Sequence, residues 1–252
     1  MSIPKVIHYC WFGGNPLPKS AEKCIKSWKK YCPDYKIIRW DESNFDTSCN
    51  PYCKYAFENK KWAFLTDYVR LKVVFEHGGV YMDTDVELLK PLDILIKDGA
   101  YMGFQDDVEV ATGLGFAAEK GHAFVGENMR YYEELNDFTD LRACPVITTK
   151  LLVPHGLKRN DNTVQKVANM NIYPAEYLCP KNERSGLSEI TPNTYSIHHF
   201  DASWFEKSWK EGRNKRWRRE KLRYIIHTPN RILIKLLGNE RYEKIKHLLK
   251  RG

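Results

Sequence analysis

Residues 78–87 read GGVYMDTDVE, and the interpretation of the whole chain starts from this stretch. The two glycines are a natural end for a preceding helix, and residues 80–82 have the apolar content of a short buried strand. Two carboxylates, Asp83 and Asp85, follow that strand directly. Because open α/β sheets bind ligands at the carboxyl ends of their strands, this order predicts a polar site at the sheet edge.

The chemistry of Asp83 and Asp85 is that of a divalent cation site. Residues two apart in an extended chain point to the same side, so both carboxylates would face the crevice. Carboxylate oxygens suit Mg²⁺ or Mn²⁺, which keep free positions for diphosphate oxygens. An isolated Asp-x-Asp is more commonly a solvated turn, and here only its surroundings favour the metal site.

A second polar pair precedes the stretch. The apolar spacing of residues 62–77 predicts a helix, on which Asp67 and Arg70 lie three apart and share a face. That face offers a carboxylate for sugar hydroxyls and a guanidinium for phosphate or sugar oxygens. An ordinary surface ion pair is the alternative.

The flanking sequence alternates between strand-like and helix-like segments. Residues 3–12, 35–40, 100–104, 113–117 and 171–174 read as strands, and residues 17–31 and 124–135 as helices. This alternation predicts an α/β sheet with helices on both faces.

Four ordered motifs carry a resemblance to a known family. They are residues 3–14 (IPKVIHYCWFGG), 65–71 (LTDYVRL), 78–85 (GGVYMDTD) and 197–204 (IHHFDASW). Together they resemble glycosyltransferase family 32, which includes yeast mannosyltransferases and bacterial capsular or lipopolysaccharide sugar transferases and shares its pattern with clostridial glucosylating toxins. The resemblance implies a GT-A-like α/β fold, a mixed central sheet flanked by helices, in which a nucleotide sugar binds.

The resemblance also implies residue roles. Trp11 would stack on the nucleotide base, unless it is a core tryptophan, and Asp67 and Arg70 would hold the sugar. Asp83 would contact sugar and ribose or reach the metal through water, while Asp85 would ligate it directly. The predicted catalytic residues are Asp67, Arg70, Asp83 and Asp85. The predicted donor-binding residues are Tyr9, Trp11, Thr66, Asp67, Arg70, Tyr81, Asp83, Ser203 and Trp204, the last two on a loop that closes over the diphosphate.

Several assignments stay open in the sequence. One of His198 and His199 is expected to complete the metal shell, because adjacent residues of an extended segment face opposite ways, and His199 is preferred. The expected metal ligands are therefore Asp83, Asp85 and His199, with Mn²⁺ or Mg²⁺. Asp106 and Asp107 fit either a sugar contact or a turn, and residues 112–113 fit either a donor contact or a strand start.

The carboxyl-terminal segment is basic and amphipathic. From residue 206 to 252 there are 16 basic and 5 acidic residues, which leaves 24 basic and 27 acidic residues before it. We therefore expect a catalytic domain over residues 1–205 and a helical extension over 206–252 that binds an anionic membrane surface. A solvated helix is the alternative. Nucleic acid is not an expected partner, because the segment contains no recognisable binding module.

Length, cysteine content and the start of the sequence give expectations for domain number and cellular location. A length of 252 residues with 42% hydrophobic residues supports one catalytic-sized domain. The start of the sequence has no leader pattern and the seven cysteines are scattered, so we expect a cytoplasmic protein with reduced thiols, peripherally bound to the inner face of the plasma membrane.

The favoured function is metal-dependent transfer of a hexose, from a UDP-sugar and with retention, to a surface-glycan or lipid-linked acceptor. A haloacid-dehalogenase-type phosphohydrolase is an alternative, since residues 83–86 also fit its nucleophile loop. That loop normally follows the first strand of its domain, whereas a β-α-β unit and a helix precede this one. A noncatalytic sugar-nucleotide or glycan-binding module is the other alternative.

Overall fold

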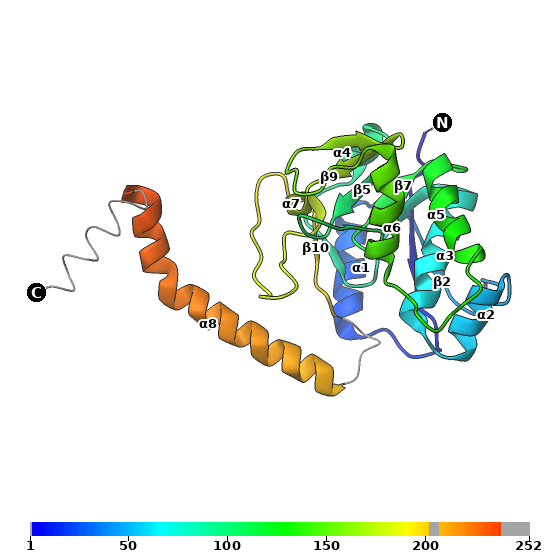
Figure 1. The fold of residues 1–252 in the computed structure, drawn as a ribbon, viewed down its shortest axis with the longest axis horizontal. Helices are drawn as coiled ribbons and strands as arrows, with labels where there is room; N and C mark the ends of the chain where they lie inside the picture. The colour runs from blue at the N-terminus through cyan, green and yellow to red at the C-terminus, as the bar shows by residue number, and fades with distance from the viewer. Residues whose placement is uncertain (1, 202–206, 238–252) are drawn as a thin grey trace, which may run out of the picture. The chain divides into compact units, whose positions relative to one another are not determined.

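The computed structural model describes residues 2–201 and 207–237, with side chains described up to residue 226 (Figure 1). Its residues form two units, which are described separately: residues up to 181 together with 188–201, and residues 182–187 together with the carboxyl-terminal helix. The boundary expected at residue 205 lies outside the described residues and stays a prediction.

A mixed sheet forms the centre of the first unit. Its strand order is β2-β1-β3-β7-β5-β9-β8, with β6 added on β5. β1 runs parallel to β2 and β3, β7 runs antiparallel to β3 and β5, and β5 runs parallel to β9. The strands are β1 (Val6–Cys10), β2 (Lys36–Trp40), β3 (Gly79–Tyr81), β5 (Tyr101–Phe104), β6 (Val110–Ala111), β7 (Phe116–Ala118), β8 (Gln165–Val167) and β9 (Met170–Tyr173). A separate two-stranded sheet pairs β4 (Val86–Leu88) with β10 (Ser196–His198).

Helices cover both faces of the central sheet (Figure 1). Because successive strand residues face opposite sides, Tyr81 joins one apolar cluster while its neighbours Val80 and Met82 join the other. The first cluster includes α2, α3, α5 and α6, and the second includes α1, α4 and α7. The helices are α1 (Lys19–Tyr31), α2 (Pro51–Glu58), α3 (Trp62–His77), α4 (Asp93–Lys97), α5 (Ala123–Glu133), α6 (Cys144–Leu152), α7 (Ala175–Leu178) and α8 (Lys207–Leu237), with a 3-10 turn at Val153–His155.

The expected α/β architecture, with a mixed central sheet flanked by helices, is confirmed. The predicted helix over residues 62–77 is α3, and the strand that follows it is β3. The strand predicted over residues 113–117 begins only at Phe116, because Gly115 has a φ of +113°, outside the extended region.

The Gly78-Gly79 turn fixes how α3 passes into β3. Both glycines have positive φ, +69° and +109°. A Cβ atom at residue 79 would lie 2.8 Å from the carbonyl oxygen of Val6 on β1, so only glycine allows the two strands this approach. The turn therefore sets the position of β3 and of the carboxylates that follow it.

The second unit is built on α8. The indole of Trp217 donates a hydrogen bond to the carbonyl oxygen of Glu183 (2.8 Å), and Arg213 lies over the rings of Trp209 and Trp217. Leu222, Ile225 and Ile226 are each about 60% exposed. Within the described residues, no helix combines the length and apolar content needed to cross a bilayer.

Candidate functional site

Asp83, Thr84 and Asp85 form a turn between β3 and β4. The backbone N–H of Asp83 donates to the carbonyl oxygen of Gly113 (3.1 Å), and that of Val86 donates to the carbonyl oxygen of Asp83 (3.0 Å). This geometry differs from the extended run expected, yet it still gathers the two carboxylates at the carboxyl end of β3.

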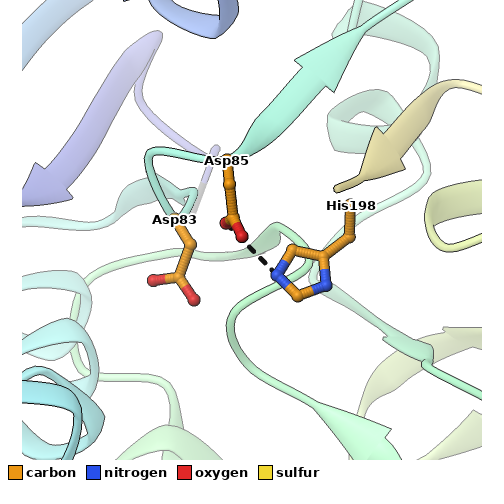
Figure 2. Close-up of side chains that lie close together, drawn as sticks. All are labelled: Asp83, Asp85 and His198. Carbon is orange, nitrogen blue, oxygen red and sulfur yellow. Dashed lines mark ion pairs between the residues drawn. The ribbon is translucent and has the colours of Figure 1, made fainter. Parts of the chain in front are cut away.

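His198 completes a cluster of three possible metal ligands (Figure 2). Among the described residues, Asp83, Asp85 and His198 each offer one ligand atom, and these atoms lie within 4.8 Å of one another. Nε2 of His198 lies 3.2 Å from Oδ1 of Asp85. Because carboxylate oxygen and imidazole nitrogen are both metal ligands, the donor set fits a single divalent cation.

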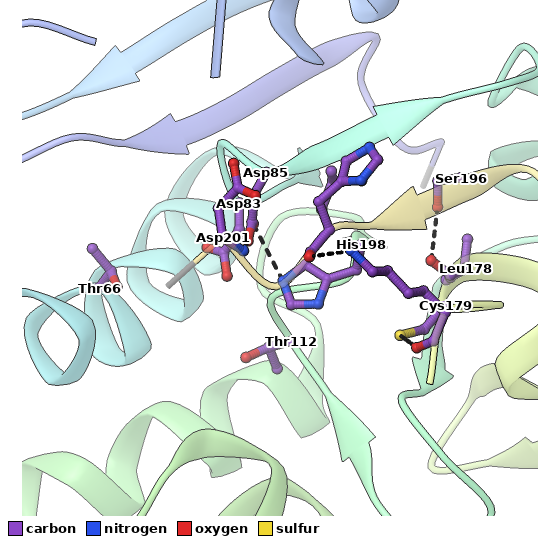
Figure 3. A network of polar contacts seen from close by, with 12 residues as sticks. Thr66, Asp83, Asp85, Thr112, Leu178, Cys179, Ser196, His198 and Asp201 are labelled. Atoms are coloured by element: carbon purple, nitrogen blue, oxygen red, sulfur yellow. Dashed lines mark hydrogen bonds and ion pairs between the residues drawn. The ribbon is translucent and has the colours of Figure 1, made fainter. Parts of the chain in front are cut away.

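The pairing of β10 with β4 brings His198 to the turn. In the antiparallel register His198 lies opposite Val86, the residue after Asp85. The N–H of Asp201 donates to Oδ2 of Asp85 (2.8 Å), and the N–H of His199 donates to its carbonyl oxygen (2.9 Å). Figure 3 shows Asp85, His198 and Asp201 in this network, so segments more than a hundred residues apart meet here.

His199, the histidine expected at the metal, points elsewhere. Its Nε2 lies 2.8 Å from a carboxylate oxygen of Glu87, which also pairs with Lys23 at 3.2 Å. Neighbouring residues on a strand face opposite sides, so only one of the two histidines can reach Asp85. The register of β10 against β4 gives that position to His198.

The protonation states of Asp85 and His198 depend on each other. Burial alone would raise the pKa of Asp85, but the imidazole of His198 and the N–H of Asp201 outweigh it and lower this pKa to about 2. Burial disfavours a charged His198, yet Asp85 holds the pKa of the imidazole well above its usual value. Asp85 is therefore ionised in this environment, and its charge favours the protonated form of His198.

Arg70 lies behind the cluster as a buried cation between two carboxylates. Its guanidinium is 3.3 Å from Asp67 and 3.1 Å from Asp83, and its side chain is only 4% exposed. It also donates to the carbonyl oxygen of Thr66 (3.0 Å) and to the hydroxyl of Thr66 (3.2 Å). Burial raises the pKa of Asp67 to about 6 against the opposing charge of Arg70. Arg70 thus holds Asp67 and Asp83 in place at the same time.

Tyr81 and Gly113 fix the Asp83 carboxylate from two further sides. The Tyr81 hydroxyl donates to Oδ1 of Asp83 (2.8 Å), and the Arg70 guanidinium lies 5.0 Å from the centre of the Tyr81 ring. A Cβ atom at residue 113 would lie 2.3 Å from the other carboxylate oxygen, Oδ2, so the glycine leaves room for it. The observed position of the Asp83 carboxylate therefore requires that residue 113 carry no side chain.

Two of the remaining predicted donor-binding residues, Trp11 and Tyr9, lie on or directly after β1. Trp11 follows β1 and is half-buried, with its indole N–H bonded to the carbonyl oxygen of Asn15 (2.7 Å). Tyr9 packs edge-on against Trp28, with ring centres 5.7 Å apart, and is buried in the second apolar cluster. Ser203 and Trp204 lie outside the described residues.

Asp106 and Asp107, which the sequence left open between a sugar contact and a turn, lie in a turn. Oδ1 of Asp106 accepts the N–H groups of Val108 and Glu109, both at 2.8 Å. The carbonyl oxygen of Asp107 accepts a hydrogen bond from the backbone N–H of Asn160. Asp106 therefore acts as the first residue of a side-chain-stabilised turn.

Two parts of the site were not predicted from the sequence. Asp201, whose N–H binds Asp85, lies in the quoted 197–204 motif, but its backbone carries no sequence signal. The sequence left Gly113 open between a donor contact and a strand start, and its approach to Asp83 depends on the sheet pairing of β3 with β7.

Comparison with known proteins gives one family match. Residues 18–102 match the family model described as "Glycosyltransferase sugar-binding region containing DXD motif". This segment contains Asp67, Arg70, Asp83 and Asp85.

Similar proteins carry related names. Inositol phosphoceramide mannosyltransferase 3 of Schizosaccharomyces pombe is 29% identical over 134 residues, covering 51% of this chain and 37% of that protein. Mannosyl phosphorylinositol ceramide synthase CSH1 of Saccharomyces cerevisiae is 24% identical over 217 residues, covering 81% and 55%. The matches thus span about half or less of each relative's length.

Solved structures with a similar arrangement include PaToxG glycosyltransferase, with a TM-score of 0.46, 18% identity and coverage of 60% of this chain and 68% of that one. A glycosyltransferase involved in glycosylation of the major capsid of PBCV-1 has a TM-score of 0.45, 12% identity and coverage of 86% and 100%.

Proposed function

We propose that this chain, whose residues 18–102 match a glycosyltransferase sugar-binding region with a DXD motif, transfers a hexose from a nucleotide sugar to a hydroxyl of a glycan or lipid-linked acceptor. The observation that carries the proposal is the cluster of Asp83, Asp85 and His198, backed by the buried Arg70.

The cluster would hold Mn²⁺ or Mg²⁺. Its two carboxylates suit either ion, and its imidazole favours the transition metal, so Mn²⁺ is the first ion to test. When bound, such a cation supplies neutralising charge for the departing nucleoside diphosphate.

Residues of the chain itself orient the donor. Arg70 and Tyr81 hold Asp83 in one rotamer, which preorganises the carboxylate before substrate arrives. Asp67, held by Arg70, is proposed to accept hydrogen bonds from sugar hydroxyls, and Trp11 to stack on the base. Tyr9 and Thr66 are proposed to support these two contacts from neighbouring positions.

We favour a UDP-hexose donor and retention of the anomeric configuration, as the resemblance to family 32 implies. In front-face attack, the acceptor oxygen forms its bond to the anomeric carbon as the bond to the diphosphate breaks, and the hydroxyl proton passes to the departing diphosphate oxygen. Since two relatives are named for mannosyl transfer, mannose is the alternative sugar and GDP-mannose the alternative donor.

We also propose peripheral attachment to an anionic membrane through α8. Its exposed Leu222, Ile225 and Ile226 lie at helical spacing among basic residues. Two relatives are named for reactions on ceramide lipids, which supports an acceptor at a bilayer surface. Attachment to the inner face of the plasma membrane is part of this proposal.

A donor-hydrolysis screen tests the function. Purified protein with Mn²⁺ is incubated with UDP-glucose, UDP-galactose, UDP-N-acetylglucosamine and GDP-mannose in turn, and released nucleoside diphosphate is measured. We expect release from one donor, abolished by EDTA and by Asp85→Asn. If no donor is hydrolysed and calorimetry detects no metal-dependent nucleotide binding, the transferase proposal is overturned.

A further inference from the structure

A second cavity lies in the first unit, lined by residues other than those of the ligand cluster. It has a volume of about 470 Å³ and is open to solvent. The residues that matter for its chemistry are Asp98, Asn171, Tyr173, Tyr177, Asn193 and Tyr195. We call this cavity the tyrosine pocket. Its volume is in the range typical of small-molecule sites, about 300–1,000 Å³.

The aromatic wall consists of three tyrosine rings. Tyr173 and Tyr177 have ring centres 4.9 Å apart, and Tyr177 and Tyr195 are nearly parallel, at 8°, with centres 6.4 Å apart. Tyr177 and Tyr195 are only half-buried, although each is large and apolar in its ring. The pocket therefore presents aromatic surface to whatever enters it.

Backbone hydrogen bonds hold this wall in place. The N–H of Tyr195 donates to the carbonyl oxygen of Tyr177, and the N–H of Leu89 donates to that of Tyr195, both at 2.8 Å. The hydroxyl of Thr194 donates to the carbonyl oxygen of Glu176 (2.8 Å). The rings thus stand on a fixed framework, which reduces the entropy lost when a ligand binds.

Polar groups surround the aromatic wall. The exposed side chains of Asp98 and Asn193 lie at the rim, and the amide of Asn171 donates to the carbonyl oxygen of Asp98 (2.9 Å). Lys90 lies with its ammonium 5.1 Å from the centre of the Tyr195 ring and donates to the carbonyl oxygen of Pro192. Because the amide nitrogens of Asn171 and Asn193 already donate to Asp98 and Glu176, it is the Asp98 carboxylate, the amide oxygens and the tyrosine hydroxyls that lie around one aromatic face.

We propose that the tyrosine pocket binds a neutral sugar unit of the acceptor glycan, away from the position where the hexose is added. A pyranose has an apolar C–H face, which packs on an aromatic ring, and a periphery of hydroxyls, which pair with carboxylates and amides. An acyl chain would make no use of the Asp98 carboxylate, whereas a sugar hydroxyl can donate to it, so a sugar fits this pocket better than a lipid. The assignment rests on the proposed transferase function.

The pocket is joined to the ligand cluster through a short segment. Tyr195 immediately precedes β10, whose last residue is His198. β10 pairs with β4, which begins directly after Asp85. A glycan held by Tyr195 would therefore be anchored on the same strand that carries a candidate metal ligand.

Binding is tested by saturation-transfer NMR and calorimetry with mannotetraose, maltotetraose and chitotetraose, on the full chain without donor. We expect at least one of them to bind, with transfer to its ring C–H protons, and Tyr177→Ala to weaken binding at least tenfold, or about 1.4 kcal/mol. Tyr177→Phe should retain binding. Tyr31→Ala, which removes a half-buried tyrosine outside the pocket, is the matched control.

A second variant guards against misfolding of Tyr177→Ala. Val164 lies at the rim and is 46% exposed, so Val164→Arg should obstruct the mouth without disturbing the core. Absence of binding to all three tetrasaccharides, or equal affinity in wild type, Tyr177→Ala and Val164→Arg, overturns the assignment.

Donor hydrolysis separates this proposal from the transferase function. We expect Tyr177→Ala and Val164→Arg to hydrolyse donor at the wild-type rate, because neither residue touches the ligand cluster. Tetrasaccharide binding that depends on Tyr177, in a protein that hydrolyses no donor and binds no nucleotide, would sustain the pocket and refute the transferase. Donor hydrolysis without such binding would do the reverse.

Discussion

The Asp83 carboxylate occupies space that a side chain at Gly113 would need: a Cβ atom at residue 113 would stand 2.3 Å from Oδ2 of Asp83 and 3.0 Å from the Arg70 guanidinium. The carboxylate cannot simply turn aside, because Arg70 and Tyr81 hold its other oxygen. The absence of a side chain at residue 113 is thus a condition for the observed position of Asp83.

Gly113→Ala should therefore displace Asp83. We expect kcat/KM for donor hydrolysis to fall by one to two orders of magnitude, the scale on which misplaced catalytic groups act. Gly212→Ala is the control, since a Cβ there meets no atom within 4 Å. Activity of Gly113→Ala equal to that of Gly212→Ala would show that the position of Asp83 is unimportant.

Asp85→Asn should weaken binding of Mn²⁺ and abolish most metal-dependent turnover. The substitution keeps the shape of the side chain but removes the charge next to His198. Glu87→Gln is the matched control, because Glu87 lies two residues later and pairs with His199 and Lys23 instead. Titration of Mn²⁺ by calorimetry measures the difference, and equal affinities in the two variants would contradict the ligand assignment.

Arg70→Met should destabilise the fold as well as the site. It leaves Asp67 and Asp83 without their cation, and breaking a buried pair typically costs about 3–5 kcal/mol. Chemical denaturation measures the free energy of unfolding. The triple variant Asp67→Asn, Asp83→Asn, Arg70→Met should recover part of the loss, because no unpaired charge remains buried. If the triple variant is no more stable than Arg70→Met, the pairing is not the cause.

We predict that the free energy of unfolding decreases at acid pH because of the buried His8. Its Nδ1 accepts from the indole of Trp40 (3.0 Å), so its protonated Nε2 donates to the carbonyl oxygen of Gly78 (2.9 Å). Burial lowers the pKa of this neutral imidazole from 6.5 to about 4.

The unfolded chain therefore binds a proton near pH 6.5, whereas the folded chain does so only near pH 4. The contribution of His8 to the free energy of unfolding is fully present above pH 6.5. Between pH 6.5 and 4 it falls by about 1.4 kcal/mol per pH unit. His8→Gln, with an amide that can make both bonds, should flatten this part of the profile. Parallel profiles for wild type and His8→Gln would exclude His8 as the source.

The apolar stripe on α8 should govern membrane binding. Replacing Leu222, Ile225 and Ile226 with serine should reduce sedimentation with vesicles that contain 30% phosphatidylserine, and should leave donor hydrolysis in solution unchanged. Vesicles of phosphatidylcholine alone, and 0.5 M NaCl, test the contribution of the basic residues. Equal sedimentation of wild type and the triple serine variant would contradict the proposed role of the stripe.

Local order along the chain was enough to predict the first half of the site. The run from α3 through Gly78-Gly79 into β3 places Asp67, Arg70, Asp83 and Asp85 within a short stretch, where periodicity and turn chemistry are informative. Pairing between distant segments was not predictable in the same way. Whether His198 or His199 faces Asp85 depends on a one-residue choice of register between β10 and β4, and a single-residue slip exchanges the two faces of a strand.

Tyr9 illustrates a related limit. Its place in a family-like motif predicted a ligand contact, which stays a prediction, but nothing in the sequence indicated that its ring packs edge-on against Trp28. The tyrosine pocket was equally hidden, because its walls come from α4, β9, α7 and the segment before β10, and no spacing in the sequence links them.

The β4–β10 pairing also bears on how the protein forms. The Glu87–His199 contact joins residues 112 apart, so the chain between them must fold or be held before the loop can close. During synthesis, the ribosome delivers both aspartates long before it delivers His198 and the N–H of Asp201. The nascent chain therefore carries two neighbouring carboxylates without these partners until nearly all of the first unit has emerged, which makes the candidate site one of the last features of that unit to assemble.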